Sequence, residues 1–233
     1  MSLAAQTLAI LRKDLLAEWR TKERLSPMVF LVLLILLVFN FSFALGGAAL
    51  VDIGPGVLWS AFVFASLLGL QRTFAAEHDN GCLDALLVAP VSRTGLYLAK
   101  ALANLLYLLA VEVIALPLFA LFFNLPAGAY LLPLPLVLVL GSACLASVGT
   151  LFAAMAGHTR LREFLLPLLL LPIVMPALIS CVEATAAILE QSRPGAAAAL
   201  WPPALLAHVL MLAVYAVIFT TLSLMLFEHV IEE

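Results

Sequence analysis

The sequence predicts an all-α integral membrane protein with six transmembrane helices, preceded by an amphipathic helix at the membrane surface. Hydrophobic residues make up 65% of the 233 residues and charged residues 11%, whereas soluble domains are about 25% charged. Six stretches are apolar over roughly the 20 residues that a helix needs to cross a hydrocarbon core of about 30 Å. They are 27–47, 57–74, 96–123, 133–157, 164–182 and 203–227. Their continuous apolar character favours helices over the alternating strands of a membrane barrel.

The basic residues predict the orientation of these helices. All but one of the 11 Lys and Arg residues lie before the first apolar stretch, or in or beside the connections that follow the second and fourth stretches; Arg193 is the exception. By the positive-inside rule, both termini face the cytoplasm (N-in, C-in). The first apolar stretch is long enough to remain as an anchor, so no cleaved signal peptide is expected. The expected location is a bacterial inner membrane, which the chain crosses several times.

Residues 1–25 predict an amphipathic elbow helix that precedes the membrane domain at 26–233. One helical face carries apolar residues at spacings of three and four: Ala4, Leu8, Leu11, Leu15 and Trp19. The opposite face is polar and includes Lys13 and Arg20. Such a helix lies in the membrane interface, with Trp19 at the depth of the headgroups and the cations toward anionic lipid. It is either a plain anchor or an elbow that also docks a partner.

The long polar interruption of the chain is the connection 75–95, between the second and third apolar stretches. Within it, Leu83, Leu86 and Leu87 share one helical face. Gly81 permits a turn into this helix, and Pro90 prevents its continuation. The connection therefore predicts a short cytoplasmic helix that can fill a groove of a soluble partner. The alternative is a surface loop whose apolar residues touch lipid.

The outer connections are predicted to be short, except for the last. Residues 51–56 contain Gly and Pro and predict a tight turn. Prolines are expected to interrupt the fifth span at three positions: Pro167, Pro172 and Pro176. Residues 177–202 predict a segment that re-enters the membrane from outside, where protein or water satisfies its backbone. Trp201 is predicted to anchor the start of the last span at the interface.

Two further residues are candidates for a function within the membrane. Glu112 lies well inside the third predicted span, where a carboxylate is costly and usually faces a cavity or a partner. The alternative is a hydrogen-bonded or neutral carboxyl near the outer interface. His208 lies early in the last span and can ligate haem iron or another metal, or simply form a hydrogen bond. The spacing of His and Cys residues does not match a zinc site or a covalent haem site, so no metal site is predicted.

The sequence does not contain the motifs of an enzyme. Its glycines do not form the nucleotide-binding loop G-x-x-x-x-G-K-[ST], and it has no G-x-S-x-G motif. Cys82, Cys144 and Cys181 do not form a C-x-x-C pair and are expected to be small packing residues. We therefore expect no cofactor to bind this chain directly, and any ATP that drives it must bind another chain.

The connection 75–95 resembles the cytoplasmic loop of ABC-2-type permeases. The resemblance rests on Glu77, Gly81, Leu83, Asp84, Leu86, Leu87, Pro90 and Arg93, followed by Lys100 at the start of a span. With the N-terminal RKDLLAEWRTKE helix, the six spans, the short outer connections and the Pro-rich fifth span, the whole chain is similar to the CcmB family, the haem exporter B permeases of cytochrome c maturation. This resemblance implies that the eight loop residues form a coupling segment that sits in a groove of an ATPase.

The CcmB resemblance also implies partners. It implies a non-catalytic permease subunit that works as a homodimer with the ATPase CcmA, the haem-handling protein CcmC and the small membrane protein CcmD. In that complex, ATP hydrolysis by CcmA is linked to the release of the haem-loaded periplasmic chaperone CcmE, so the complex as a whole handles haem. Two other hypotheses stay open: an ABC-2 exporter of a lipid, polysaccharide or drug, and a transporter or scaffold that works without an ATPase.

Overall fold

The computed structural model describes residues 2–42, 47–74, 92–123, 128, 131–157, 161–192 and 201–230. These residues form seven long α-helices and one short 3-10 helix. They are α1 (Leu3–Thr21), α2 (Leu25–Ser42), α3 (Gly47–Gln71), α6 (Arg93–Phe122), α7 (Leu134–Gly157), α8 (Arg162–Leu189), η2 (Glu190–Ser192) and α9 (Pro203–Val230). All of the α-helices except α1 are long and apolar enough to cross a membrane. The predicted all-α architecture with six spans is confirmed.

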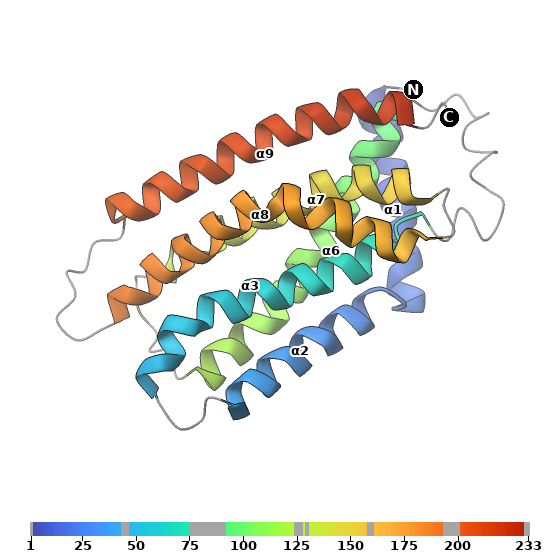
Figure 1. Cartoon of the computed structure of the whole chain (residues 1–233). Helices are drawn as coiled ribbons and strands as arrows, with labels where there is room; N and C mark the ends of the chain where they lie inside the picture. Colours follow the sequence, from blue (N-terminus) through green and yellow to red (C-terminus); the bar gives the residue numbers. More distant parts are fainter. Residues whose placement is uncertain are drawn as a thin grey trace.

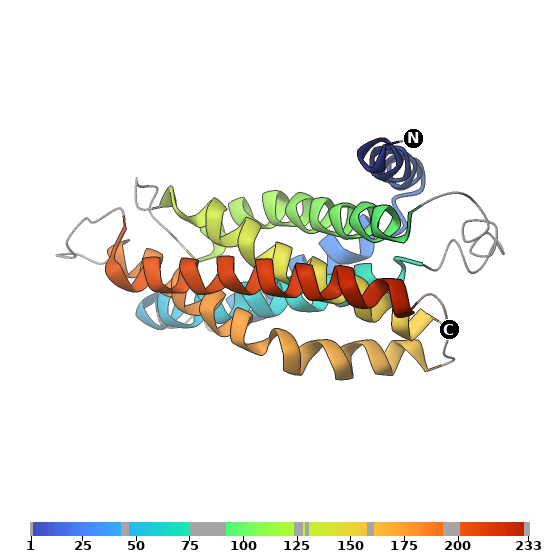
Figure 2. The same cartoon turned by 90° about the horizontal axis from the view of Figure 1, so that it is seen from above.

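The six apolar helices lie side by side in one bundle, and α1 lies across one end of it (Figures 1 and 2). Both termini lie at this same end, as an even number of spans requires (Figure 1). The centre of the bundle is formed by α3 and α7, whose spans are 72% and 78% buried, whereas the spans of α2 and α9 are 17% buried. Large apolar side chains such as Phe30 and Val217 are exposed on these outer helices, as expected of surfaces that face hydrocarbon.

Glycines allow the two central helices to approach closely. A Cβ atom at Gly141 of α7 would overlap the ring of Trp59 of α3, and one at Gly149 would overlap Leu70. Small residues are typical of such contacts, because transmembrane helices associate through close packing of their backbones. Larger residues at these two positions would push α7 away from α3.

The predicted turn at 51–56 is wrong. Helix α3 begins at Gly47 and runs through these residues, with Pro55 inside the helix. A backbone near the membrane is stabilised by hydrogen bonds within its own helix, and this overrides the local Gly and Pro signals.

The predicted interruption of the fifth span by prolines is also wrong, because α8 continues through all three of them. Nearby hydroxyl groups bond to the backbone in this part of the helix. The hydroxyl of Tyr215 of α9 donates to the carbonyl of Ile173 at 2.6 Å, and that of Ser180 donates to the carbonyl of Pro176 at 3.1 Å. These two carbonyls are not the ones that the prolines leave without an N–H partner, which lie four residues before each proline. The bonds instead tie this part of α8 to α9 and to its own next turn, and the helix stays continuous within the packed bundle.

The segment at 177–202 is described in part. Residues 177–189 form the last turns of α8 and η2 follows them, while residues 193–200 lie outside the described residues. The re-entrant segment therefore stays a prediction.

Candidate functional site

The polar connection between α3 and α6 joins the bundle at the end where both termini lie (Figure 1). Residues 75–91 lie outside the described residues, and with them seven of the predicted coupling residues: Glu77, Gly81, Leu83, Asp84, Leu86, Leu87 and Pro90. The eighth, Arg93, is the first residue of α6 and is partly buried. The described part contains the two roots of the connection, by which we mean Phe74 just after α3 and Ser92 just before α6.

Helix α1 binds directly to the Ser92 root. Ser92 is the N-cap of α6, and its hydroxyl oxygen accepts a hydrogen bond from the backbone N–H of Gly95 at 3.2 Å. The side-chain oxygen of Gln6 on α1 accepts two hydrogen bonds from Ser92, one from its backbone N–H at 3.2 Å and one from its hydroxyl at 3.1 Å. The hydroxyl of Thr7, which donates to the carbonyl of Leu3 within α1 at 3.0 Å, also lies 3.4 Å from the carbonyl of Gly95. The start of α6 is therefore held by α1 through both backbone and side chains.

A buried ion pair forms a second contact between α1 and α6. The carboxylate of Asp14 lies 2.9 Å from the ammonium of Lys100, and the two side chains are only 6% and 1% exposed. Lys13 also approaches Asp14, at 3.3 Å, but its side chain is 55% exposed. The Lys100 ammonium lies 5.7 Å from the ring centre of Phe74. This one cation therefore contacts both α1 and the Phe74 root.

Glu18 fixes the turn between α1 and α2, residues 22–24, which we call the elbow. The elbow turns at Lys22, whose φ of 54° is uncommon for a residue other than glycine. The buried carboxylate of Glu18 accepts hydrogen bonds from the backbone N–H groups of Arg24 at 3.0 Å and Leu25 at 2.8 Å. N–H groups at the start of a helix have no partner within that helix. A side chain from α1 thus caps α2.

Arg24 connects this elbow to α3 and α6. Its guanidinium donates to the carbonyl of Thr73 at 3.5 Å, next to the Phe74 root. It also lies 5.7 Å from the ring centre of Tyr107 on α6. The elbow therefore contacts both helices that lead into the connection.

A chain of buried polar side chains leads from this end into the bundle. The hydroxyl of Thr73 donates to the side-chain oxygen of Asn104 at 3.1 Å, and the Asn104 amide donates to the hydroxyl of Thr150 on α7 at 2.9 Å. All three residues are buried. The hydroxyl of Tyr97 on α6 also donates to the carbonyl of Ser147 on α7, at 3.0 Å. Hydrogen bonds therefore connect the end of α3 and the start of α6 to α7.

The face of α1 that contacts the protein differs from the apolar face that its spacing predicts. Of that predicted face, Leu11 and Leu15 pack toward the core, whereas Leu8 and Trp19 are 65% and 82% exposed. The buried polar residues of α1 are Asp14 and Glu18, which sequence reasoning missed. A signal was present, because these two acids lie one turn apart and follow Leu11 at helical spacing. The assignment of Trp19 to the membrane interface stays a prediction.

Glu112 and His208 do not belong to the cluster around the roots. Glu112 is 2% exposed and lies on α6, 12 residues beyond Lys100, or about 18 Å along the helix. Its Oε1 accepts a hydrogen bond from the hydroxyl of Ser142 on α7, and its Oε2 has no hydrogen-bond partner among the described residues. His208 is partly buried near the start of α9. Within the described part of the chain, no three His, Cys, Asp or Glu side chains gather as a metal site.

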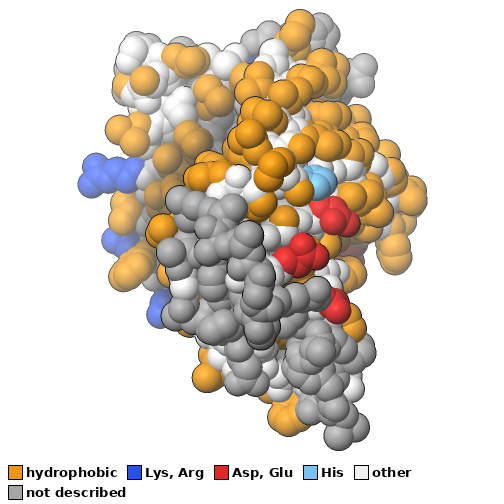
Figure 3. All heavy atoms as spheres, turned by 90° about the vertical axis from the view of Figure 1, so that its left-hand side faces the viewer, with side chains coloured by type: hydrophobic (Ala, Val, Ile, Leu, Met, Phe, Trp, Pro, Cys, Tyr) orange, Lys and Arg blue, Asp and Glu red, His pale blue; other side chains and the backbone are white. Residues whose placement is uncertain are grey.

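Among the described residues, acidic side chains lie at the end of the bundle opposite the termini. Acidic side chains and a histidine gather on this face beside large apolar areas (Figure 3). The described acidic residues there are Asp52 near the start of α3, and Glu183 and Glu190 near the end of α8. Trp201, the predicted interface anchor, precedes α9 at this end and is 46% exposed. Lys and Arg residues of α1, of the elbow, of the segment just after α3 and of the first turns of α6 lie toward the other end, in agreement with the distribution of cations from which the orientation was predicted.

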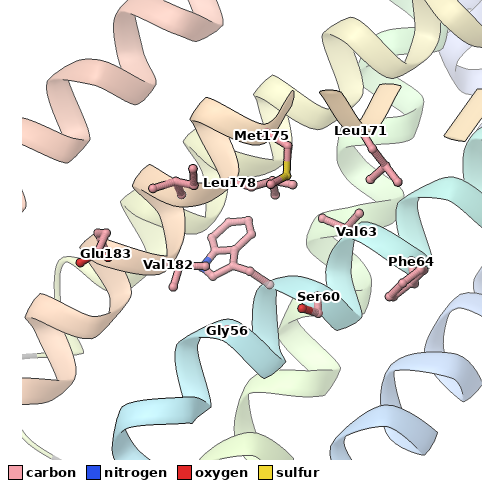
Figure 4. A pocket seen from close by; sticks show the side chains of 11 residues that line it. Gly56, Ser60, Val63, Phe64, Leu171, Met175, Leu178, Val182 and Glu183 are labelled. Atoms are coloured by element: carbon pink, nitrogen blue, oxygen red, sulfur yellow. The ribbon is translucent and has the colours of Figure 1, made fainter. Parts of the chain in front are cut away.

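An apolar cleft of about 400 Å³ lies between α3 and α8. Val63 and Phe64 of α3 face Leu171, Met175 and Leu178 of α8 across it (Figure 4). The indole of Trp59 also lines the cleft, and its N–H donates to the hydroxyl of Thr185 at 2.9 Å. The cleft can accept an apolar group, but it offers no arrangement of nucleophile, base and acid for catalysis.

Comparisons with known proteins place these features in context. The family model described as CcmB protein matches residues 5–225, which include most of α1, the connection and most of α9. Heme exporter protein B of Rhodobacter capsulatus is 35% identical over 175 residues, which are 75% of this chain and 80% of the relative. Heme exporter protein B of Paracoccus denitrificans is 34% identical over 76% of this chain and 80% of the relative. That of Pseudomonas aeruginosa is 33% identical over 91% of this chain and 93% of the relative.

Proposed function

The chain belongs to the CcmB family, and on this premise we propose that it is the non-catalytic permease subunit of an ABC transporter complex for cytochrome c maturation. In this complex a separate ATPase subunit binds and hydrolyses ATP. The permease couples this hydrolysis to the delivery of haem and the release of a haem-loaded periplasmic chaperone. The observation that supports the proposal is that the end of α3 and the start of α6, on either side of the connection, are bonded to α1, to the elbow and to α7.

The coupling step uses the connection between the two roots. Leu83, Leu86 and Leu87 form the apolar face that fills a groove of the ATPase. Closure of the ATPase on ATP pushes this segment, and the push reaches α3 through the Phe74 root and α6 through the Ser92 root. Because the roots bond to rigid helices, the displacement moves spans instead of being lost in a loop.

The proposed partners are those of a cytochrome c maturation system. They are a CcmA-like ATPase, CcmC-like and CcmD-like membrane proteins and a CcmE-like haem chaperone, with two copies of this chain in the complex. The complex lies in the bacterial inner membrane, with α1, the connection and both termini in the cytoplasm. Haem is handled by the complex as its cargo.

The substitution Leu86→Asp tests the coupling segment. A carboxylate in the middle of the apolar face should abolish binding of the ATPase, because a charge buried without a partner is costly. Leu86→Met, which keeps an apolar side chain of similar size, is the matched control. Both variants should reach the membrane at the level of the unchanged protein, and only Leu86→Asp should lose the co-purified ATPase. Stoichiometric ATPase with Leu86→Asp would disprove this role of the connection.

A second candidate function is an ABC-2 exporter of a lipid or another apolar compound, which the apolar cleft between α3 and α8 favours. Purification of the protein from its native membrane, followed by mass spectrometry of the bound proteins, separates the two. Recovery of an ATPase with CcmC-like and CcmE-like proteins supports the maturation complex. Recovery of an ATPase alone supports the exporter, and recovery of no ATPase supports a scaffold or a transporter driven in another way.

A further inference from the structure

The two contacts between α1 and α6 match in spacing and direction. Gln6 and Asp14 lie eight residues apart on α1, and their partners Ser92 and Lys100 lie eight residues apart on α6. Eight residues of helix span about 12 Å. The N-terminal turns of α6 are therefore fastened to α1 at two points, over more than two helical turns of each.

The nature of the Asp14–Lys100 pair indicates that it fixes position. A buried ion pair adds little to stability compared with apolar residues of the same volume, because both ions lose their hydration. Its removal from one side, however, leaves a charge without a partner in a buried site. One alignment of α1 on α6 places Asp14 against Lys100, and slippage of α1 by a residue breaks the pair. The pair thus selects one alignment.

The same helix also holds the other neighbours of the connection. Through Glu18, α1 caps the start of α2, and through Arg24 the elbow bonds to the backbone beside the Phe74 root. While the Asp14–Lys100 pair is intact, α1 moves together with the Ser92 root. Because Glu18 of α1 caps α2, the start of α2 moves with them.

We propose that α1 is a strap that makes the start of α6 and the start of α2 move as one body, and that the Asp14–Lys100 ion pair locks this strap. Asp14 and Lys100 are positioning residues for the coupling of ATP hydrolysis to haem handling. This inference rests on the proposed function for its activity readout, and on the geometry of α1 and α6 for its structural readout.

The activity test measures ATPase binding and ATP hydrolysis in the purified complex, and cytochrome c maturation in cells that carry the same variant. Asp14→Asn should keep the ATPase bound and hydrolysing ATP, while the amount of matured cytochrome c falls about tenfold, within the range typical of coupling between sites. Glu23→Gln, which neutralises an exposed acid at the elbow, is the matched control and should behave as the unchanged protein. If Asp14→Asn loses both the bound ATPase and cytochrome c maturation, Asp14 has only a structural role and the proposal is overturned. Unchanged maturation overturns it as well.

The structural test does not depend on the partners. In isolated membranes that hold a chain with its native cysteines replaced, Gln6→Cys with Ser92→Cys should form a disulfide across the first contact when a thiol oxidant is added. Adding Asp14→Asn should lower the yield of this disulfide severalfold, and adding Glu23→Gln should not. An equal yield in all three overturns the strap. If the unchanged protein binds no ATPase, the proposed function fails while this cross-link still decides the role of the ion pair.

The reversed pair keeps the test decisive where Asp14→Asn does not accumulate in the membrane. D14K with K100D restores opposite charges at the same two positions and should recover both the protein level and a large part of cytochrome c maturation. Each of these two substitutions alone should recover neither. Failure of the reversed pair to exceed the single variants would overturn the lock.

Discussion

Buried charges at the end with both termini have charged or multiple partners, whereas the buried carboxyl in the middle of the bundle has one neutral partner. At the end, Asp14 pairs with Lys100 at 2.9 Å and Glu18 accepts from two backbone N–H groups. In the middle, Glu112 accepts from the hydroxyl of Ser142, and its second oxygen has no hydrogen-bond partner among the described residues. The two regions therefore differ in how their buried acidic groups are bonded: those at the end have ionic or multiple partners, and the one in the middle keeps an oxygen without a hydrogen bond.

This difference separates a region built for fixed geometry from a region that can respond. A buried charge that meets an opposite charge or several donors makes one arrangement favourable and penalises others, which fits the proposed role of this end as the root of the coupling segment. Within the spans, the helices are joined instead by neutral bonds, such as those from Asn104 to Thr150 and from Trp59 to Thr185. An intramembrane carboxyl that is incompletely bonded is the kind of group that marks a functional position.

Lys100→Met should have the largest effect on stability. The substitution keeps an apolar chain of similar length but leaves the Asp14 carboxylate buried without its main partner. We expect the free energy of unfolding to fall by about 3–5 kcal/mol, the usual cost of breaking a buried pair from one side. Unfolding in sodium dodecyl sulfate, followed by tryptophan fluorescence, measures this loss.

The control for this prediction is Lys22→Met. Lys22 is exposed at the elbow, and both residues are equally able to adopt its positive φ, so the change should stay within about 0.5 kcal/mol, as for most surface positions. Equal losses for the two variants would show that Lys100 is not a buried partner, and would remove the basis of the comparison between the two regions.

Gly141→Ala should have an intermediate effect, and it acts in the middle of the bundle without changing any charge. The new methyl group meets the Trp59 ring and the Cys181 sulfur, so overpacking should cost about 1–3 kcal/mol. Gly56→Ala is the matched control, because a Cβ at Gly56 has no atom within 4 Å. Alanine there should leave the free energy of unfolding unchanged or raise it slightly, because it favours the helix. A harmless Gly141→Ala would mean that α3 and α7 do not pack as closely as described.

The spans were predictable because the bilayer leaves few choices. A stretch of about 20 apolar residues must form a helix there, and the six predicted stretches each fall on one of the described helices. The same rule explains the two errors, since at 51–56 and at the prolines of α8 the helix continued where local signals predicted a break. In a soluble protein, water can bond to the backbone groups that are left free at a break in a helix, so Gly and Pro signal a break more strongly there than in a membrane.

The partners of the buried charges of α1 could not be predicted from the sequence. The spacing of Asp14 and Glu18 after Leu11 places them on one face, but the partner that buries Asp14 lies 86 residues further on, at Lys100. The role of Glu18 depends on an elbow whose turn at Lys22 has no glycine to signal it. The residues of the coupling segment between the roots remain predictions from the sequence and from the family resemblance.

Glu112→Gln should have the smallest effect on stability and is the sharpest probe of the interior carboxyl. The amide has nearly the same size and its oxygen can still accept the hydrogen bond from Ser142, so the free energy of unfolding should change by less than about 1 kcal/mol. If the ionisable group itself takes part in haem handling, cytochrome c maturation should nevertheless fall severalfold at an unchanged protein level, which is the result we expect.

Ser142→Ala is the complementary variant, because it removes the hydroxyl but keeps the carboxyl. It should lower the free energy of unfolding by about 1–3 kcal/mol, as for a buried group left unbonded. Unchanged maturation with Glu112→Gln would show that the middle of the bundle tolerates a carboxyl without using it. Glu112 would then differ from Asp14 and Glu18 only in how it is packed and bonded, and not in function.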